Sequence, residues 1–248
     1  MSEFIKVSLE APLCLIRIAR PEKKNALTSP MYAAMTAALA AANADAAIRV
    51  ICILGAPGMF SAGNDIQEFM TFAKGGALGP EVVEFLKSLA TNEKPLVAGV
   101  DGIAVGIGAT LLLHCDYVVA SERTNLSTPF ASLGLVPEAG SSLLGPRLMG
   151  HARAFAMLAM GRPMPARQAE VVGLVNEVVA PEEVERQALA AARDIAARPA
   201  EAMAIARALL RPAPAETLAR IEREVVLFGE RLRSDEARAA FNAFLSRK

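Results

Sequence analysis

Short apolar runs alternate with segments of helical period through the part of the chain before Gly150. The runs typical of strands are 4–10, 13–20, 50–55, 94–102 and 116–122. Segments that are apolar at helical spacing, or apolar throughout, lie between them at 31–43, 65–72, 81–90 and 106–115. Because strands that alternate with helices pair in parallel through helical crossovers, this pattern predicts an α/β fold.

The chain after Gly150 is helical in period almost throughout. The expected helices have Pro or Gly at their boundaries, as helix ends commonly do, and they span 151–160, 181–198, 199–210 and 214–233. The charge-rich stretch 220–238 is interpreted as a solvated helix face. No internal repeat or low-complexity linker interrupts the chain, so we expect an α/β core followed by a helical C-terminal third.

Composition adds that the chain is apolar and electrically neutral. Hydrophobic residues make up 53% of the 248 residues, and the mean hydropathy is +0.34. No apolar run approaches the roughly 20 residues that cross a bilayer, so we expect no membrane span. The apolar surplus is then buried inside the chain or between subunits, which favours a homo-oligomer. The formal net charge of zero argues against a nucleic-acid partner.

The N-terminus and the cysteines indicate a cytoplasmic protein. The first ten residues read as a strand and lack the basic and apolar segments of a secretory signal. Cys14, Cys52 and Cys115 lie in apolar runs without metal-ligand spacing. We therefore expect three reduced core cysteines and no metal site.

Two turns with glycine are candidates for chemistry. FSAGNDI (60–66) and VDGIAVGIGATLLL (100–113) each lead from a strand into a helix. Free N–H groups at helix starts bind anions, and two converging turns make an oxyanion hole. The alternative is a pair of ordinary turns, the first capped by Asp65. A dinucleotide fingerprint is not favoured, because Leu111 stands where its third glycine would fall.

A single acid stands out in the uncharged stretch GLVPEAGSS (134–142). It is Glu138, and the nearest carboxylates along the chain are Glu122 and Glu170. Isolation alone is compatible with a solvent-exposed loop or with a functional acid. His114, in a Leu-rich run, is interpreted as a core residue rather than a catalytic one.

Taken together, these segments resemble the enoyl-CoA hydratase/isomerase family, the crotonase superfamily, along almost the whole chain. The likeness is carried by RPEKKNAL (20–27), FSAGNDIQEF (60–69), KPLVAGVDGIAVGIGATLLLHCDYVVASE (94–122), LGLVPEAGSS (133–142) and GLVNEVV (173–179). The resemblance implies a crotonase-like spiral core of ββα turns over 1–195. It also implies a helical region over 196–248 that forms a homotrimer, or a hexamer made of two trimers.

The family binds acyl-CoA thioesters and stabilises an enolate anion. The resemblance implies that the backbone N–H groups of Asn64 and Ile107 hold the thioester oxygen. It assigns substrate binding to Ala62, Gly63, Asn64, Asp65, Ile66, Ala26, Gly106 and Phe130. Coenzyme A is part of the substrate in this family, so no separate cofactor is expected.

The resemblance also bears on whether the expected reaction is hydration or isomerisation. The two glutamates of the hydratases fall on Thr110 and Phe130 of this chain, and neither residue can act as an acid–base group. The segment around Glu138 is most similar to peroxisomal-type Δ3,Δ2-enoyl-CoA isomerases, in which the glutamate after proline is the base. The resemblance therefore implies that Glu138 moves a double bond from 3-enoyl-CoA to 2-trans-enoyl-CoA, in fatty-acid β-oxidation.

Other readings stay open at this point. The chain could be an enoyl-CoA hydratase with unusual residues, or a thioesterase of the same superfamily. It could also be a non-catalytic acyl-CoA-binding module that keeps the fold without turnover.

Overall fold

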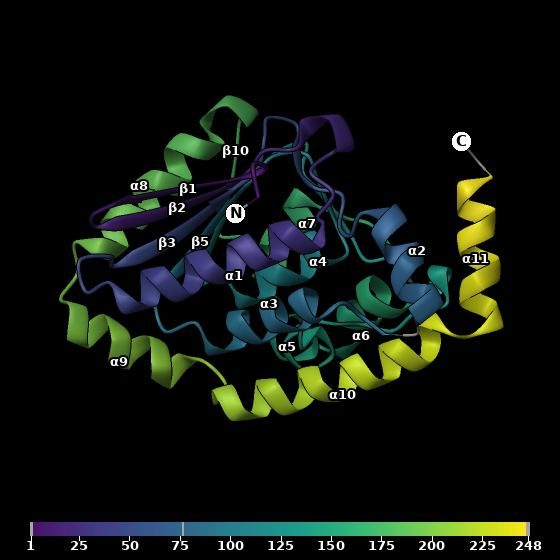
Figure 1. The fold of residues 1–248 in the computed structure, drawn as a ribbon. Coiled ribbons are helices and arrows are strands. Elements are labelled where there is room, and N and C mark those ends of the chain that lie inside the picture. Colours follow the sequence, from purple (N-terminus) through teal and green to yellow (C-terminus); the bar gives the residue numbers. More distant parts are fainter. Residues whose placement is uncertain (1, 76, 247–248) are drawn as a thin grey trace.

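A six-stranded sheet forms one layer of the molecule (Figure 1). The computed structural model describes residues 2–75 and 77–246. Its strands, in spatial order, are β1 (Ile5–Glu10), β2 (Leu13–Ile18), β3 (Val50–Leu54), β5 (Leu96–Val100), β7 (Tyr117–Ser121) and β10 (Glu177–Val179). β1 pairs with β2 in antiparallel register, and all the other neighbours are parallel. The five predicted strand runs and the α/β fold class are confirmed.

The central strands of this sheet are buried on both faces, which explains their unbroken apolar runs. In β3, Val50 and Cys52 belong to the apolar cluster that includes Ala188 of helix α8 (Val184–Ala196). Ile51 and Ile53 point to the opposite face and join the main core. Helices α1 (Ser29–Ala44) and α3 (Pro80–Thr91) lie on that side of the sheet (Figure 1).

A second, smaller sheet was not predicted from the sequence. Its strands are β4 (Met59–Ser61), β6 (Ile103–Val105), β8 (Asn125–Ser127) and β9 (Met164–Pro165). The first three are parallel, and each follows a strand of the large sheet along the chain. Strands of two or three residues are too short to show an apolar period, so hydrophobic patterning could not reveal them.

The predicted helices of the core are present, with some differences in their bounds and type. The predicted helix 106–115 is a short α-helix, α4 (Ile107–Thr110), that continues as the 3-10 helix η2 (Leu111–His114). Two helices were not predicted: α5 (Ser141–Met149), which follows the Glu138 segment, and α7 (Ala166–Val171). The remaining core elements are η1 (Pro21–Lys23), α2 (Ile66–Gly75), η3 (Ala131–Leu133), α6 (His151–Ala154), the π-helical turn η4 (Phe155–Ala159) and η5 (Pro181–Glu183).

Three helices complete the chain: α9 (Ala200–Leu210), α10 (Pro214–Leu232) and α11 (Asp235–Leu245). α10 runs beneath the helical layer, and α11 stands beside α2 (Figure 1). The rings of Phe228 and Phe241 pack against Phe69 of α2, with centroids 5.9 and 5.4 Å away. The helical C-terminal region is thus present, while its division from the core at 195/196 stays a prediction.

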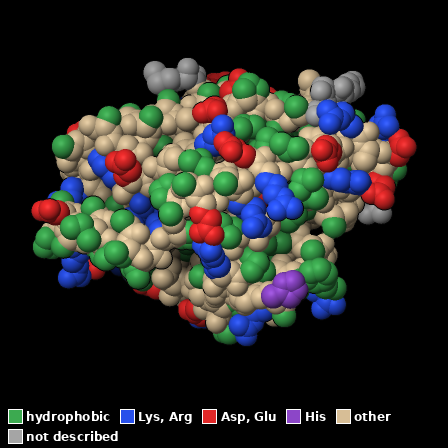
Figure 2. Space-filling model, turned by 90° about the horizontal axis from the view of Figure 1, so that it is seen from below, with side chains coloured by type: hydrophobic (Ala, Val, Ile, Leu, Met, Phe, Trp, Pro, Cys, Tyr) green, Lys and Arg blue, Asp and Glu red, His purple; other side chains and the backbone are tan. Residues whose placement is uncertain are grey.

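Several large apolar side chains remain exposed on the surface of the single chain. Figure 2 shows hydrophobic side chains gathered at the α9 end of the face seen from below. The most exposed large apolar side chains among the described residues are Val171 of α7, and Leu209 and Leu210 of α9. Cys14, Cys52 and Cys115 are free thiols, and no described helix is long and apolar enough to span a membrane.

Candidate active site

The small sheet brings three loops together. Because β4, β6 and β8 are parallel, their carboxyl ends meet at one edge, and the segments after Ser61, Val105 and Ser127 lie side by side. A Cβ atom on Gly63 would lie 2.8 Å from the carbonyl oxygen of Val105, and one on Gly108 would lie 2.8 Å from that of Ser61. The two glycine-containing turns can pack this closely only because these positions lack side chains.

The proposed oxyanion donors occupy the ends of these two turns. Asn64 stands two residues before α2, and Ile107 is the first residue of α4. Among the described residues, neither backbone N–H donates to another group of the protein. Asp65 also caps α2 as expected, since the N–H of Gln67 donates to its Oδ1 at 2.9 Å. An ordinary helix cap and free donors therefore coexist in the first turn.

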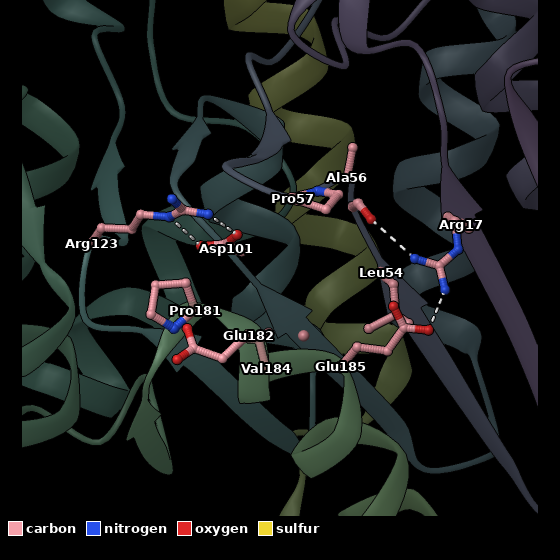
Figure 3. A pocket seen from close by; sticks show the side chains of 12 residues that line it. Arg17, Leu54, Ala56, Pro57, Asp101, Arg123, Pro181, Glu182, Val184 and Glu185 are labelled. Carbon is pink, nitrogen blue, oxygen red and sulfur yellow. Dashed lines mark hydrogen bonds and ion pairs between the residues drawn. The ribbon is translucent and has the colours of Figure 1, made fainter.

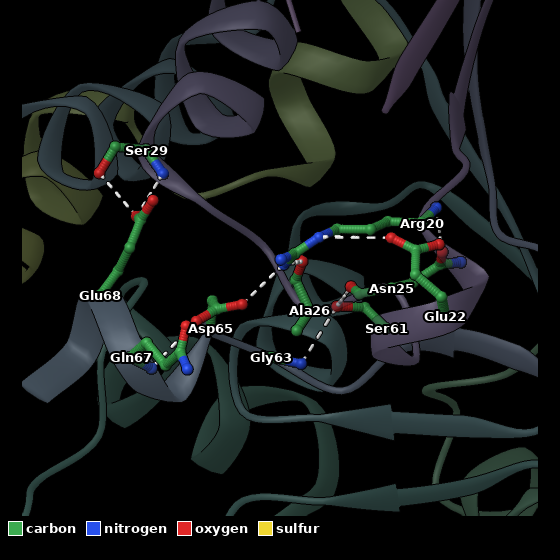
Figure 4. A network of polar contacts seen from close by, with 10 residues as sticks. All are labelled: Arg20, Glu22, Asn25, Ala26, Ser29, Ser61, Gly63, Asp65, Gln67 and Glu68. Carbon is green, nitrogen blue, oxygen red and sulfur yellow. Dashed lines mark hydrogen bonds and ion pairs between the residues drawn. The ribbon is translucent and has the colours of Figure 1, made fainter. Parts of the chain in front are cut away.

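A polar network holds the first turn in place (Figure 4). Arg20 Nη1 lies 2.7 Å from Asp65 Oδ2 and donates to the carbonyl of Ala26 at 3.0 Å. Burial pushes the pKa of Asp65 up, but the hydrogen bonds from Arg20 and Gln67 outweigh burial, so the pKa is lowered and Asp65 stays ionised.

The motif RPEKKNAL contributes a second anchor to the same network. The buried side-chain amide of Asn25 donates to the carbonyl oxygens of Ile18 and Met59, at 3.1 and 3.0 Å. Ser61 Oγ donates to the Asn25 carbonyl at 2.9 Å, and accepts from the N–H of Gly63 at 3.1 Å. The early loop is thereby fixed against β4 and the first turn.

A cavity of about 520 Å³ opens beside the turns. All eight residues predicted to bind substrate line it: Ala26, Ala62, Gly63, Asn64, Asp65, Ile66, Gly106 and Phe130. Ile107 and Glu138 are not among its lining residues, and both are buried. The other residues that line it are Glu22, Lys23, Lys24, Gln67, Phe69, Val105, Pro129, Leu133, Leu135, Phe228 and Phe241.

None of these eleven further residues was predicted to bind substrate. The doubled lysine at Lys23 and Lys24 was the one visible signal, because it places two cations in a polar loop. Nothing in the sequence marked Phe228 and Phe241 as cavity residues, since an aromatic residue at helical spacing is typical of the hydrophobic core.

Glu138 is buried, with 4% of its surface exposed, so the solvent-exposed loop interpretation is wrong. Its Oε1 accepts a hydrogen bond of 2.5 Å from the hydroxyl of Thr110. Burial raises its pKa to about 8; the Thr110 hydrogen bond opposes this rise, and the nearby charge of Glu224 adds to it. A carboxyl group with such a pKa can accept and return a proton near neutral pH.

The turn that carries Glu138 is held from α10. Glu224 Oε2 accepts the N–H of Gly140 at 2.6 Å, and Oε1 accepts the N–H and hydroxyl of Ser142 at 3.0 and 2.5 Å. Glu224 is itself buried, with 4% exposed. The interpretation of 220–238 as a solvated face is therefore wrong at this position, because one side of α10 packs on the core.

One contact brings Glu138 close to the second turn. Thr110 is in the same short helix as Ile107, so its hydrogen bond places the carboxylate beside the second turn. On the other side, the buried hydroxyl of Tyr32 donates to Asn64 Oδ1 at 2.6 Å. Burial raises the pKa of Tyr32, and the charges of Glu138 and Glu68 raise it further.

A second cavity, of about 490 Å³, lies where η5 and α8 meet the ends of β3 and β5 (Figure 3). Its arginines are paired: Arg123 with Asp101 at 2.8 and 2.5 Å, and Arg17 with Glu185 at 2.5 Å. Neither guanidinium is free for an anion, and no predicted site residue lines this cavity. Among the described residues, no cluster of His, Cys, Asp and Glu could hold a metal ion.

Comparison with known proteins identifies the class of enzyme to which this fold and site belong. The profile of the enoyl-CoA hydratase/isomerase family matches residues 8–248, so the chain belongs to this family, as the resemblance implied.

The individual relatives carry different activities in their names. Enoyl-CoA delta isomerase 2 of Rattus norvegicus is 38% identical over an alignment of 254 positions, which covers 100% of this chain but 64% of the rat protein. The 2,3-dehydroadipyl-CoA hydratase of Escherichia coli (strain K12) is 31% identical, with 100% of this chain and 97% of that protein covered. The structure of Pseudomonas aeruginosa OdaA superimposes with a TM-score of 0.92 at 40% identity, covering 98% of this chain and 99% of that one.

Proposed function

We propose that this protein is a Δ3,Δ2-enoyl-CoA isomerase of fatty-acid β-oxidation, with Glu138 as its single acid–base group. The observation that carries the proposal is the buried carboxyl group of Glu138, with a pKa of about 8, hydrogen-bonded to Thr110 in the short helix that begins with the free N–H group of Ile107. Double-bond migration needs one group that takes a proton from one carbon and returns it to another, and this arrangement supplies one.

The reaction follows from that geometry. The Glu138 carboxylate removes a proton from C2 of a 3-enoyl thioester, and the electrons move onto the thioester oxygen as a dienolate. The N–H groups of Asn64 and Ile107 donate to this oxygen, and each such donor contributes about 3 to 4 kcal/mol to stabilising the transition state. Protonated Glu138 then gives the proton to C4, which leaves the 2-trans-enoyl product and an unchanged enzyme.

Hydration is the less favoured alternative because it needs a second acid–base group. At the positions of the hydratase glutamates stand Thr110, which binds Glu138, and Phe130, which lines the cavity. Asp65 and Glu22 also line the cavity. Asp65 is paired with Arg20, and Glu22 lies on the early loop beside the lysines. No described carboxylate of the cavity is thus placed like a second hydratase glutamate.

The cavity also supports the proposed ligand. Lys23 and Lys24 on the early loop suit the phosphates of coenzyme A, and the aromatic side chains of α2, α10 and α11 suit an acyl chain. Coenzyme A belongs to the substrate, and the mechanism calls for no further cofactor. We place the enzyme in the cytoplasm, in line with its three free thiols.

The proposed assembly is a homotrimer or a dimer of trimers. Exposed apolar side chains of α7 and α9, among them Val171, Leu209 and Leu210, support it, because such a patch on a single chain is stabilised by burial against a further subunit.

The substrate test separates the proposed activity from its alternatives. We expect 3-enoyl-CoA to be converted into its conjugated isomer, seen as a rise in the ultraviolet absorbance of the 2-enoyl thioester. Supplied with 2-enoyl-CoA, the enzyme should show hydration at least about 100-fold slower, because one acid–base group is missing. Rapid loss of that absorbance would show a hydratase, release of the free thiol of coenzyme A a thioesterase, and no turnover of either substrate a binding module.

Thr110 sets the pH range of the proposed base. Replacing it by valine removes the hydroxyl at nearly constant volume, and a hydrogen bond to a charged group contributes about 1.5 to 3 kcal/mol. The pKa of Glu138 should then rise by about one to two units. A base acts deprotonated, so kcat/KM of the wild type should rise with pH through about 8, and this rise should move to higher pH in Thr110→Val. Thr110→Ser is the matched control and should keep the wild-type profile; equal profiles for valine and wild type would contradict the assignment.

A further inference from the structure

A buried histidine contacts the backbone next to the proposed base. The Nε2 atom of His114 lies 2.6 Å from the carbonyl oxygen of Ala139. A carbonyl oxygen only accepts hydrogen bonds, so Nε2 must carry the proton and donate it. Both residues are fully enclosed, with His114 1% and Ala139 0% exposed. Burial lowers the pKa of His114 to about 4, so the ring is neutral in the range where the enzyme is proposed to act.

The accepting residue has a strained backbone. Ala139 has φ +59°, a left-handed conformation that residues with a Cβ atom seldom adopt. It directly follows Glu138, so the backbone conformation of Ala139 determines how Glu138 is oriented relative to the residues that follow it. In the relaxed conformation of alanine, the turn would carry the carboxyl group to a different place.

The same helical segment holds both the side chain and the backbone of this turn. Thr110 and His114 are one turn apart in the α4–η2 segment, and they bind the Glu138 carboxyl group and the Ala139 carbonyl respectively. Ile107, the proposed oxyanion donor, begins this segment. One segment therefore positions both the proposed base and one of the two proposed oxyanion donors.

We propose that His114 is a positioning residue that holds the strained Ala139 peptide and thereby keeps Glu138 aligned with the oxyanion donors. The inference rests on the proposed role of Glu138 and extends it. His114 itself does not touch the substrate, so its loss should change the rate of the chemical step and leave binding of the thioester nearly unchanged.

The test compares two replacements of His114 that differ in one donor. His114→Leu loses the hydrogen bond, and His114→Gln keeps a side-chain N–H near the position of Nε2. We expect His114→Leu to lower kcat for 3-enoyl-CoA about 100-fold, the order expected for a misplacement of about 1 Å, with KM within about twofold. His114→Gln should retain most of the wild-type kcat, and the exposed His151→Gln should be unchanged.

A second substitution tests the strain directly. Ala139→Gly makes the left-handed conformation accessible without cost, so in the His114→Leu background it should restore kcat at least about tenfold. A purely structural role would leave this double variant no faster than His114→Leu.

Different results would contradict the proposed role of Glu138 and the proposed role of His114. If Glu138→Gln turns over normally, the proposed base is wrong whatever His114 does. If Glu138→Gln is inactive while His114→Leu and His114→Gln have the same kcat, or glycine at position 139 gives no recovery, the positioning role is wrong and the base stands.

Discussion

Glu138→Gln is expected to lower kcat for isomerisation of 3-enoyl-CoA by about a thousandfold, the middle to upper range of a general acid–base group. Glutamine fills the same volume and can still accept the Thr110 hydrogen bond, but it can neither take a proton from C2 nor return one to C4. Because glutamine keeps the volume and polarity of the side chain, the KM or the dissociation constant of an acyl-CoA should change little. The measurement is steady-state kinetics together with binding of a saturated acyl-CoA.

Stability provides the control that Glu138→Gln is folded. The pKa of Glu138 is raised from 4.5 to about 8 in the native state, so the native chain keeps a proton that the unfolded chain releases in this window. Wild-type stability therefore falls as pH rises from 4.5 to 8, whereas the glutamine variant lacks this dependence. At pH 9 the melting temperature of the glutamine variant should exceed that of the wild type by more than about 3 °C, and this difference should be smaller at pH 5. A variant with normal turnover would refute the assignment of the base.

Glu224→Ala is expected to have the second largest effect, on stability and turnover together. The substitution leaves three donors without an acceptor: the buried N–H group of Gly140, and the partly buried N–H and hydroxyl groups of Ser142. An unsatisfied buried donor costs about 1 to 3 kcal/mol, and a partly buried one costs less. We therefore expect the free energy of unfolding to fall by about 4 kcal/mol in total. The expected fall in Tm is about 8 to 16 °C, and the loosened turn should lower kcat as well.

Two variants sharpen this experiment. Glu224→Gln keeps one acceptor oxygen and should fall between wild type and alanine. Glu216→Ala removes an exposed glutamate of the same helix, paired with Arg147 on the surface, and should leave Tm and kcat nearly unchanged. Similar melting temperatures for Glu224→Ala and Glu216→Ala would mean that Glu224 does not hold the turn.

The elements that the sequence predicted best are those with long hydrophobic patterns. The strands of the large sheet stood out because they are buried on both faces, and α1 and α3 because of their length. The small sheet escaped because its strands have two or three residues, yet it is the sheet that brings the turns after Ser61 and Val105 together. Pairing between short strands depends on contacts across the fold rather than on local pattern.

The sequence by itself determined the fold class, the two glycine-containing turns and the isolation of Glu138, because local spacing and composition carry these features. Only the tertiary structure decided what Glu138 is: a buried acid with a raised pKa, whose hydrogen bond comes from Thr110 and whose turn is held by His114 and Glu224. Gly140 and Glu224 are 84 residues apart along the chain. The pKa and direction of a side chain depend on the charges, donors and solvent around it in space, and those neighbours come from segments that only folding brings together.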